Sequence, residues 1–213
     1  MVAIIDYDAG NMKSVEKAVM SLGKSAVATR EPEQLLSATH VILPGVGSFG
    51  DAMSKLHQYG LVDIIRSIVE QKTPFLGICL GLQLLFEYSE ESPGVEGLGI
   101  LPGKIVKIPE QGDLKNPHIG WNSLSYPNRG RLFWNIPEQS YVYFVHSYYL
   151  QAGDPNIVTA ATEYGTHIHA SVERDNVFAC QFHPEKSSEV GLTILNNFLA
   201  LSKQSHENAG EVE

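Results

Sequence analysis

Hydrophobic residues follow two alternating patterns along the first 86 positions of the chain. Short apolar runs, which predict buried strands, occupy residues 2–5, 41–43 and 75–78. Between them, apolar residues recur at helical spacing, most clearly at Met12, Val15, Val19 and Leu22. Strands that alternate with helices are typical of a parallel sheet covered by helices. The first part of the chain therefore predicts an α/β fold.

Beyond Gly94 the pattern changes to one strand after another. We expect strands over residues 104–108, 141–150, 157–162, 167–172 and 177–182, and a final amphipathic helix over 188–201. The whole pattern predicts one mostly parallel sheet flanked by helices, with antiparallel strands added in the second half. With 213 residues, 43% of them hydrophobic, the chain suits a single domain, which we place at residues 1–203. Residues 204–213 are polar and lack periodicity, so we expect a disordered tail.

Composition and charge exclude several classes of function. A net charge of -9 argues against a protein that binds nucleic acid without sequence preference, which would need clustered Lys and Arg. No apolar run is long enough to span a membrane, and the N-terminus has no basic flank or cleavage site. We therefore expect a cytoplasmic protein that binds neither nucleic acid nor membrane. In such a reducing compartment, Cys79 and Cys180 are expected to be free thiols.

Cys79 lies between Gly77 and Gly81 at the junction of a predicted strand and a predicted helix. This is the layout of a nucleophile elbow with Cys in place of Ser. The turn strains the backbone of the nucleophile, and side chains at the glycine positions would collide across it. At a helix N-terminus the thiolate is favoured, and the backbone N–H of Leu80 would donate to an oxyanion. A buried core cysteine is the competing interpretation, but the two glycines and the junction together favour a nucleophile.

His183 is the candidate base. Strand alternation over residues 177–183 puts Cys180 on one face of the strand and Gln181 and His183 nearer the other, so Cys180 is interpreted as core. Pro184 keeps His183 extended, so Glu185 can return to the side of the strand that His183 occupies. That spacing suits a carboxylate that orients an imidazole. An ordinary strand-end histidine and a helix-capping acid remain the alternative.

A glycine-rich stretch follows the strand at residues 41–43. Its sequence, Pro44-Gly45-Val46-Gly47-Ser48, can bring backbone N–H groups close to a reacting carbonyl. It lacks the Gly-Lys-Ser/Thr ending of a phosphate-binding loop. A plain tight turn before a helix is the alternative interpretation.

Together these three segments resemble the class I (triad-type) glutamine amidotransferases, which have a flavodoxin-like architecture. Three more stretches are similar to the branch of that family that forms the glutaminase subunit of imidazole glycerol phosphate synthase. They span residues 5–15, 117–122 and 143–148. Asp8 departs from the family pattern, which usually has Gly there. Because Asp tolerates left-handed backbone better than most residues, we expect the turn to survive.

The resemblance implies that the enzyme hydrolyses glutamine through a thioester. Cys79, His183 and Glu185 would form the triad, and the N–H of Leu80 with one from Gly45 or Val46 would hold the oxyanion. The resemblance assigns glutamine binding to four residues, Gln83, His146, Ser147 and Tyr148. It implies no cofactor and no metal.

The resemblance also implies a partner. The chain carries no nucleotide-binding fingerprint that would supply an acceptor for the ammonia. The family pairs this subunit in a heterodimer with a (β/α)₈-barrel cyclase, which uses the ammonia to make imidazole glycerol phosphate and aminoimidazole carboxamide ribotide in histidine biosynthesis. We expect four residues at or near that interface, Asn11, His118, Trp121 and Lys186. Core packing is the alternative for Trp121.

Two further patterns are interpreted as non-catalytic. His167 and His169 share a strand face, but no ligand set completes a metal site around them. Glu87, Glu90 and Glu91 are expected to form a solvated surface, with a contact to the amine of glutamine as the alternative.

Three other functions share parts of the pattern. An amidotransferase that feeds a different synthase would have the same triad, but would not be expected to carry the stretches at 11–15 and 117–122 together. A redox sensor on the same fold would use Cys79, yet would leave Glu185 and the glycine-rich loop unexplained. A cysteine peptidase would not need a partner.

Overall fold

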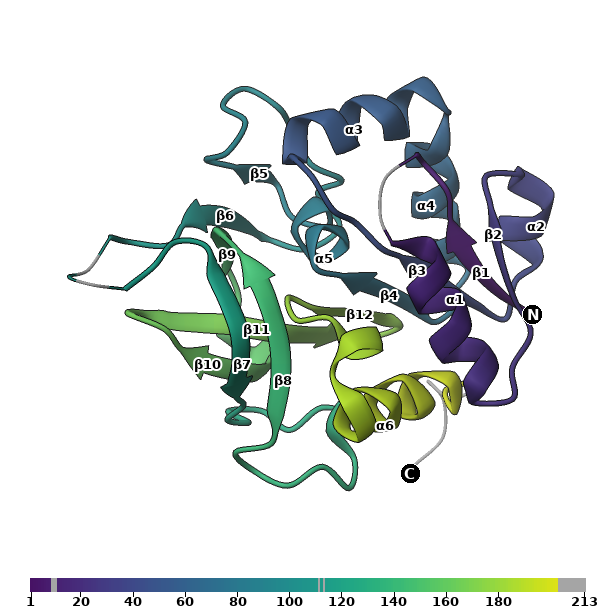
Figure 1. The fold of residues 1–213 in the computed structure, drawn as a ribbon. Helices are drawn as coiled ribbons and strands as arrows, with labels where there is room; N and C mark the ends of the chain where they lie inside the picture. Colours follow the sequence, from purple (N-terminus) through teal and green to yellow (C-terminus); the bar gives the residue numbers. More distant parts are fainter. Residues whose placement is uncertain (9–10, 111, 113, 203–213) are drawn as a thin grey trace, which may run out of the picture.

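The computed structural model describes residues 1–8, 11–110, 112 and 114–202, and has a central sheet with helices on both faces (Figure 1). The α-helices are α1 (Met12–Ser21), α2 (Pro32–Ser37), α3 (Phe49–Gln58), α4 (Leu61–Glu70), α5 (Leu80–Leu84) and α6 (Ser188–Leu199). Short 3₁₀ helices are η1 (Arg131–Phe133), η2 (Pro155–Ile157) and η3 (Pro184–Lys186). The first six strands are β1 (Val2–Ile5), β2 (Ala26–Thr29), β3 (His40–Leu43), β4 (Phe75–Ile78), β5 (Tyr88–Ser89) and β6 (Gly103–Lys107). The other six are β7 (His118–Ser123), β8 (Tyr141–His146), β9 (Tyr148–Ala152), β10 (Val158–Glu163), β11 (His167–Arg174) and β12 (Val177–Cys180).

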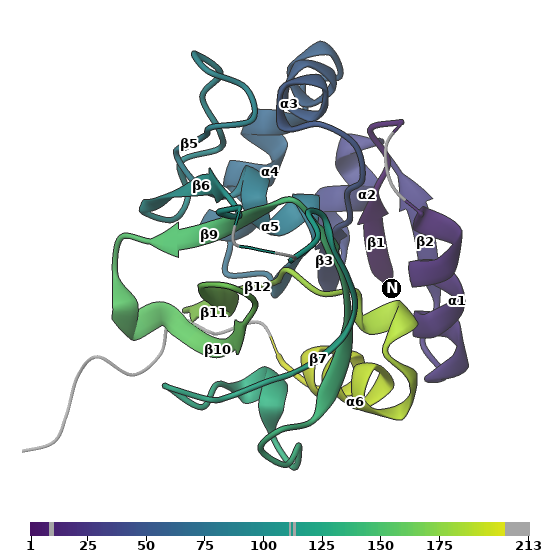
Figure 2. The same cartoon turned by 60° about the vertical axis from the view of Figure 1, so that its left-hand side comes forward.

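The main sheet has the mixed topology that the sequence predicted. Its order is β2-β1-β3-β4-β12-β11-β9-β6-β5, with β10 paired to β11. Strands β2, β1, β3, β4 and β12 are parallel, whereas β11 pairs with β12, β10 and β9 in antiparallel fashion. Strands β7 and β8 form a separate antiparallel pair, which Figures 1 and 2 show beside the main sheet.

Both faces of the parallel strands β1, β3, β4 and β12 are buried, which explains their continuous apolar sequences. On β1, Ala3 and Ile5 belong to a core shared with α2, α3, α4 and α5, whereas Val2 and Ile4 belong to a core shared with α1 and α6. Cys180 is fully buried in the second core, as predicted. The helices therefore hold the parallel strands from both sides.

One predicted strand needs correction, and not every observed strand was predicted. Residues 141–150 are not one strand: β8 ends at His146 and β9 begins at Tyr148, and the two belong to different sheets. Strand β8 pairs with β7, whereas β9 pairs with β6 and β11, and no Gly or Pro marks the break between them in the sequence. Strand β2 was not predicted, since it lies at the edge of the sheet and its residues 26–28 are only partly buried.

The carboxyl ends of the parallel strands bring the predicted chemistry together. Tyr7, Pro44, Cys79 and His183 lie at or just beyond the carboxyl ends of β1, β3, β4 and β12, which are neighbours in the sheet. In open α/β sheets, ligands bind at this edge. The tail predicted at residues 204–213 lies outside the described residues. Within the described part of the chain, no helix combines the length and apolarity that a membrane span requires.

Candidate active site

Cys79 occupies the strained turn that the sequence predicted between β4 and α5. Its backbone has φ 56° and ψ −111°, a conformation that non-glycine residues rarely adopt. A Cβ atom added to Gly81 would lie 1.8 Å from the carbonyl oxygen of Leu43, and one added to Gly77 would lie 2.7 Å from the carbonyl oxygen of Gly81. Gly81 is therefore required for the close approach of the elbow to β3, and Gly77 for the close approach of the two sides of the turn.

His183 and Glu185 form a buried pair. Nδ1 of His183 lies 2.8 Å from Oε1 of Glu185, and the two side chains are 3% and 1% exposed. Pro184 begins η3, so the chain turns directly after the extended His183 and brings Glu185 back to its ring. Nε2 of His183 has no hydrogen-bond partner among the described residues, and His183 lines the same pocket as Cys79. The free ring nitrogen is thus available to the thiol or to a substrate.

Charge around His183 favours the imidazolium. Burial alone would lower the pKa of this ring, but its interactions with Cys79 and Glu185 outweigh burial and raise the pKa to about 9. A histidine of this kind holds a proton readily once it has taken one from a thiol. Orientation by a carboxylate at Nδ1 is the arrangement of catalytic triads.

Gln181 is a residue of the site to which the sequence assigned no role. Its Nε2 lies 3.7 Å from Sγ of Cys79, and its Oε1 accepts a hydrogen bond of 3.0 Å from Nε2 of Gln83. The same Gln83 nitrogen also donates to the carbonyl oxygen of Tyr148 at 3.1 Å. Strand alternation had already placed Gln181 on the same face of the strand as His183, opposite Cys180. That pattern could have identified Gln181 as a residue of the site.

A pocket of about 320 Å³ gathers most of the residues that the sequence analysis singled out. It is lined by Val46, Gly47, Cys79, Leu80, Gln83, Glu91, Pro117, Val145, His146, Ser147, Tyr148 and His183. Gly45 is next to Val46 of the pocket lining. A Cβ atom added to Gly45 would meet the Tyr7 hydroxyl oxygen at 2.6 Å and Cβ of Leu80 at 2.7 Å. The glycine-rich loop (residues 44–48) therefore approaches the elbow closely enough to form one side of the pocket.

Glu91 corrects the interpretation of the acidic cluster. Glu87 and Glu90 are exposed, as expected of a solvated surface, but Glu91 is half-buried and lines the pocket. Its Oε2 accepts a hydrogen bond of 2.8 Å from the backbone N–H of Phe49, at the start of α3. This carboxylate thus faces the site and also anchors the helix that follows the glycine-rich loop.

His118 is buried, not exposed as an interface residue would be. It is 3% exposed and stacks on Phe144 and Tyr164, with ring centroids 4.9 and 3.9 Å away. Its Nδ1 lies 3.1 Å from Nε2 of His146, which lines the pocket. His118 therefore cannot present its ring to a partner directly. It is the first residue of β7, and its ring contacts a residue of the pocket wall.

The other three predicted interface residues are exposed. Trp121 on β7 is 50% exposed, which excludes the core interpretation of this side chain, and it contacts Tyr143 of β8 at 6.1 Å between ring centroids. Lys186 lies in η3, which is in contact with β8 and α1, and Asn11 immediately precedes α1. The three residues thus come from neighbouring elements close to the pocket.

Asp8 adopts the left-handed conformation that was expected of it, with φ 62°. The pair His167 and His169 is engaged elsewhere, since His167 contacts Glu163 and Nδ1 of His169 accepts from the N–H of Ala152. Among the residues for which the structure gives positions, no group of three or more His, Cys, Asp or Glu side chains is arranged to hold a metal ion.

Comparison with known proteins gives a consistent family match. The family model described as glutamine amidotransferase class-I matches residues 3–201. A protein of Moorella thermoacetica named imidazole glycerol phosphate synthase subunit HisH is 49% identical over 209 residues, which is 98% of each chain. A protein of the same name from Methanocaldococcus jannaschii is 47% identical over 201 residues, covering 94% of this chain and 100% of the relative.

Solved structures share the fold at lower identity. The structure of PurLQS from Thermotoga maritima superposes with a TM-score of 0.73 at 21% identity, covering 93% of this chain and 96% of that one. A crystal structure described as a glutamine amidotransferase gives a TM-score of 0.72 at 20% identity, with 93% and 97% covered.

Proposed function

The chain belongs to the class I glutamine amidotransferases, and on that premise we propose that it hydrolyses L-glutamine to glutamate and ammonia through a thioester on Cys79. The observation that carries this proposal is the convergence of Cys79, His183 and the buried Glu185 at one pocket. A thiol, an imidazole and an orienting carboxylate are the groups that acyl transfer requires.

The proposed reaction has two halves. Sγ of Cys79, whose proton has already passed to Nε2 of His183, attacks the side-chain carbonyl carbon of glutamine as a thiolate. The C–N bond then breaks, His183 returns the proton to the departing nitrogen, and ammonia leaves behind a glutamyl thioester. In the second half His183 takes a proton from water and keeps it, the resulting hydroxide attacks the thioester carbonyl, and the sulfur leaves as a thiolate. Glutamate is released and the free enzyme is restored.

Both halves pass through a tetrahedral oxyanion. We assign its stabilisation to the backbone N–H of Leu80, the first residue of α5, and to a backbone N–H of Gly45 or Val46. The approach of Gly45 to Leu80 supports this assignment, since it brings the glycine-rich loop against the elbow. Fixed N–H donors at the developing negative charge need no reorganisation during the reaction.

Residues around the rest of the pocket would hold the substrate. Gln83, His146, Ser147 and Tyr148 line it, which supports their proposed role in binding glutamine. We add Glu91, whose carboxylate faces the same pocket and suits the α-ammonium group of the substrate.

We propose that the ammonia passes to a cyclase subunit. The relatives from Moorella and Methanocaldococcus are named as subunits of imidazole glycerol phosphate synthase, which supports the same assembly for this chain. The partner would be a (β/α)₈-barrel cyclase bound as a heterodimer. It would use the ammonia to make imidazole glycerol phosphate and aminoimidazole carboxamide ribotide in histidine biosynthesis. Because free ammonia in neutral water is largely protonated and no longer nucleophilic, direct transfer to a docked partner keeps it reactive.

The proposed docking face contains Asn11, Trp121 and Lys186, with the buried His118 behind it. The exposed side chains of Ile119, on the same strand as Trp121, and of Tyr141, on the adjacent strand, extend the apolar part of this face. An exposed apolar face supports a protein partner.

We also propose that residues 1–203 form one domain, followed by a short tail. The proposed setting is the cytoplasm, where both cysteines would remain the free thiols that are observed.

Replacing the two cysteines separately tests the chemistry. Cys79→Ala should abolish glutamate release and should prevent capture of a glutamyl thioester by acid quenching and mass spectrometry. Cys180→Ala is the matched control, because Cys180 is fully buried and does not line the active-site pocket. It should retain both signals. Glutamate release that survives Cys79→Ala would refute the thioester mechanism.

A further inference from the structure

The turn that follows β1 contacts the glycine-rich loop through the buried side chain of Tyr7. The hydroxyl of Tyr7 donates a hydrogen bond of 2.8 Å to the carbonyl oxygen of Pro44, the first residue of the loop. Tyr7 is fully buried, and burial raises the pKa of its hydroxyl, so the group remains a donor throughout the neutral range. The same oxygen lies against Gly45, whose Cα has no room for a side chain there.

The middle of the glycine-rich loop lies between two cavities. Val46 and Gly47 line the active-site pocket on one side and a second cavity of about 480 Å³ on the other. Both residues are exposed. The position of their backbone therefore depends on how the ends of the loop are held.

The far end of the loop is held by the start of α3. Ser48 caps this helix by accepting from the N–H of Asp51 at 3.2 Å, and the N–H of Phe49 donates to Glu91. At the near end, the hydrogen bond from Tyr7 meets the chain one residue before Gly45. Tyr7 thus acts at the end that lies beside the proposed oxyanion donors.

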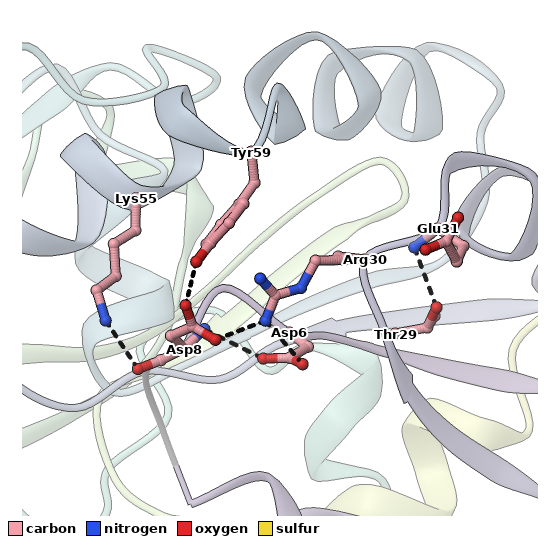
Figure 3. A network of polar contacts seen from close by, with 7 residues as sticks. All are labelled: Asp6, Asp8, Thr29, Arg30, Glu31, Lys55 and Tyr59. Atoms are coloured by element: carbon pink, nitrogen blue, oxygen red, sulfur yellow. Dashed lines mark hydrogen bonds and ion pairs between the residues drawn. The ribbon is translucent and has the colours of Figure 1, made fainter.

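Asp8 fixes the turn that carries Tyr7 (Figure 3). Its Oδ1 lies 2.6 Å from Nη2 of Arg30, its Oδ2 accepts from the hydroxyl of Tyr59, and its carbonyl oxygen accepts from Nζ of Lys55 at 3.0 Å. Arg30 also lies 3.0 Å from Asp6 and stacks over the ring of Tyr59. These contacts tie the turn to the end of β2 and to the last turn of α3 and the residue after it. The turn after β1 therefore contacts the first residue of the loop, Pro44, through Tyr7, and the helix that follows the loop, α3, through Asp8.

We propose that Tyr7 is a positioning residue for catalysis. Its hydrogen bond to Pro44 holds the backbone of the glycine-rich loop in the position that oxyanion binding requires. The contacts of Asp8 with Arg30, Tyr59 and Lys55 in turn hold the turn that carries Tyr7 in place. This inference rests on the proposed function, because it assigns a geometric role within that reaction. Tyr7 is not among the residues that line the active-site pocket. Its effect passes through the loop.

Tyr7→Phe removes the hydroxyl and keeps the ring in the core. With a cyclase subunit and its nucleotide substrate present, kcat for glutamate release should fall roughly 10- to 100-fold, because a small displacement of an oxyanion donor is costly. KM for glutamine should change less than about twofold, since the pocket side chains stay in place. Tyr126→Phe is the matched control: it also removes a tyrosine hydroxyl that donates to a proline carbonyl, Pro137 at 3.3 Å, far from the loop. It should leave kcat unchanged.

Alkylation of Cys79 by iodoacetamide separates positioning from damage to the fold. In that reaction the S–C bond forms as iodide leaves a saturated carbon, so no oxyanion develops. The alkylation rate of Tyr7→Phe should therefore equal that of the unmodified chain while its kcat falls. Equal losses in alkylation and turnover would contradict the proposal, because they would show a general disturbance of the elbow.

Asn, like Asp, tolerates the left-handed backbone at position 8, so Asp8→Asn removes only the charge. Because Asp8 is exposed, the substitution should leave the packing of the core unchanged. It should lower kcat in the same direction as Tyr7→Phe, by less, with unchanged alkylation. If the unmodified chain is active and both variants keep its full kcat, this inference is overturned while the proposed function stands. Absence of glutamate release from the unmodified chain, with and without the cyclase, would instead overturn the proposed function.

Discussion

Nδ1 of His183 lies 2.8 Å from Oε1 of Glu185 in a region where neither side chain is more than 3% exposed. Although burial opposes it, the pKa of His183 rises to about 9 through Cys79 and Glu185, compared with about 6.5 for an unfolded histidine. A raised folded-state pKa contributes stability that is fully present below about pH 6.5 and is lost as the pH rises through about 9. The imidazolium that the reaction needs is therefore also a source of pH-dependent stability.

Glu185→Gln should reduce this contribution. We expect the variant to be less stable than the unmodified chain by about 2 kcal/mol at pH 6.5, with the difference narrowing towards and above pH 9. Urea unfolding at several pH values between 6.5 and 9.5 measures it. Glu163→Gln is a suitable control, because Glu163 contacts His167 at an exposed position and its loss should cause no such pH-dependent change. A constant difference across the range would contradict the pairing.

His118 and His146 should both remain neutral at physiological pH. Nδ1 of His146 lies 2.8 Å from the carbonyl oxygen of Tyr148 and must carry the proton, so its Nε2 accepts from Nδ1 of His118. Burial lowers the pKa of His118 to about 4 and that of His146 to about 3. In ¹⁵N NMR spectra, neither ring should titrate between pH 5.5 and 9, whereas His183 should titrate near pH 9. Protonation of His118 or His146 within that range would show that the assigned hydrogen bonds are wrong.

His118→Phe should weaken glutamine binding without removing the chemistry. Phenylalanine preserves the stacking on Phe144 and Tyr164, but Nε2 of His146 loses its buried donor. We expect KM for glutamine to rise roughly tenfold while the alkylation rate of Cys79 stays the same. An unchanged KM would mean that the histidine pair has no influence on the pocket.

Trp121→Ala should weaken binding of the cyclase. A half-exposed tryptophan on an apolar face is a frequent hot spot, and its truncation commonly costs about 2 kcal/mol or more of binding free energy. The concentration of cyclase that gives half-maximal stimulation should therefore rise at least about 30-fold. Trp134, 69% exposed, provides the control, and Trp134→Ala should leave the stimulation curve unchanged. Similar shifts for both variants would place the docking face elsewhere.

Gly81→Ala should prevent the elbow from forming. The added Cβ would lie 1.8 Å from a backbone carbonyl oxygen of β3, which has no flexible end to move aside. We expect a loss of about 3 kcal/mol or more in unfolding free energy, measured by denaturant titration. Gly153→Ala is the milder comparison, since its closest contact would be 3.2 Å. Equal stability of both variants would contradict the tight approach of the elbow to β3.

Much of the fold and the triad could be predicted because their signals are local. The two glycines around Cys79 reflect a steric requirement of a turn only a few residues long, and the apolar runs of β1, β3 and β4 reflect burial on both faces. The face assigned to Cys180 followed from the two-residue period of a strand. In each case the signal lies within a few residues of sequence, although the contact that requires Gly81 is with the carbonyl oxygen of Leu43 in β3.

Features that depend on distant contacts could not be predicted in this way. Glu91 faces the pocket because a long loop folds over the start of α3, and nothing in its local sequence distinguishes it from exposed Glu87 and Glu90. His118 resembles an interface residue by its motif, but stacking on Tyr164, 46 positions away in sequence, buries it. The division at Ser147 depends on which strands β8 and β9 pair with. The contact from Tyr7 to Pro44 joins two turns that are 37 residues apart in sequence.

Glutamate release from glutamine by the purified chain, alone and with a cyclase subunit that carries its nucleotide substrate, tests the central claim most directly. The account predicts slow release by the chain alone and strong stimulation by the loaded cyclase, both abolished by Cys79→Ala. Equal release with and without the cyclase would contradict the proposed partnership, and absence of release in both conditions would contradict the glutaminase itself.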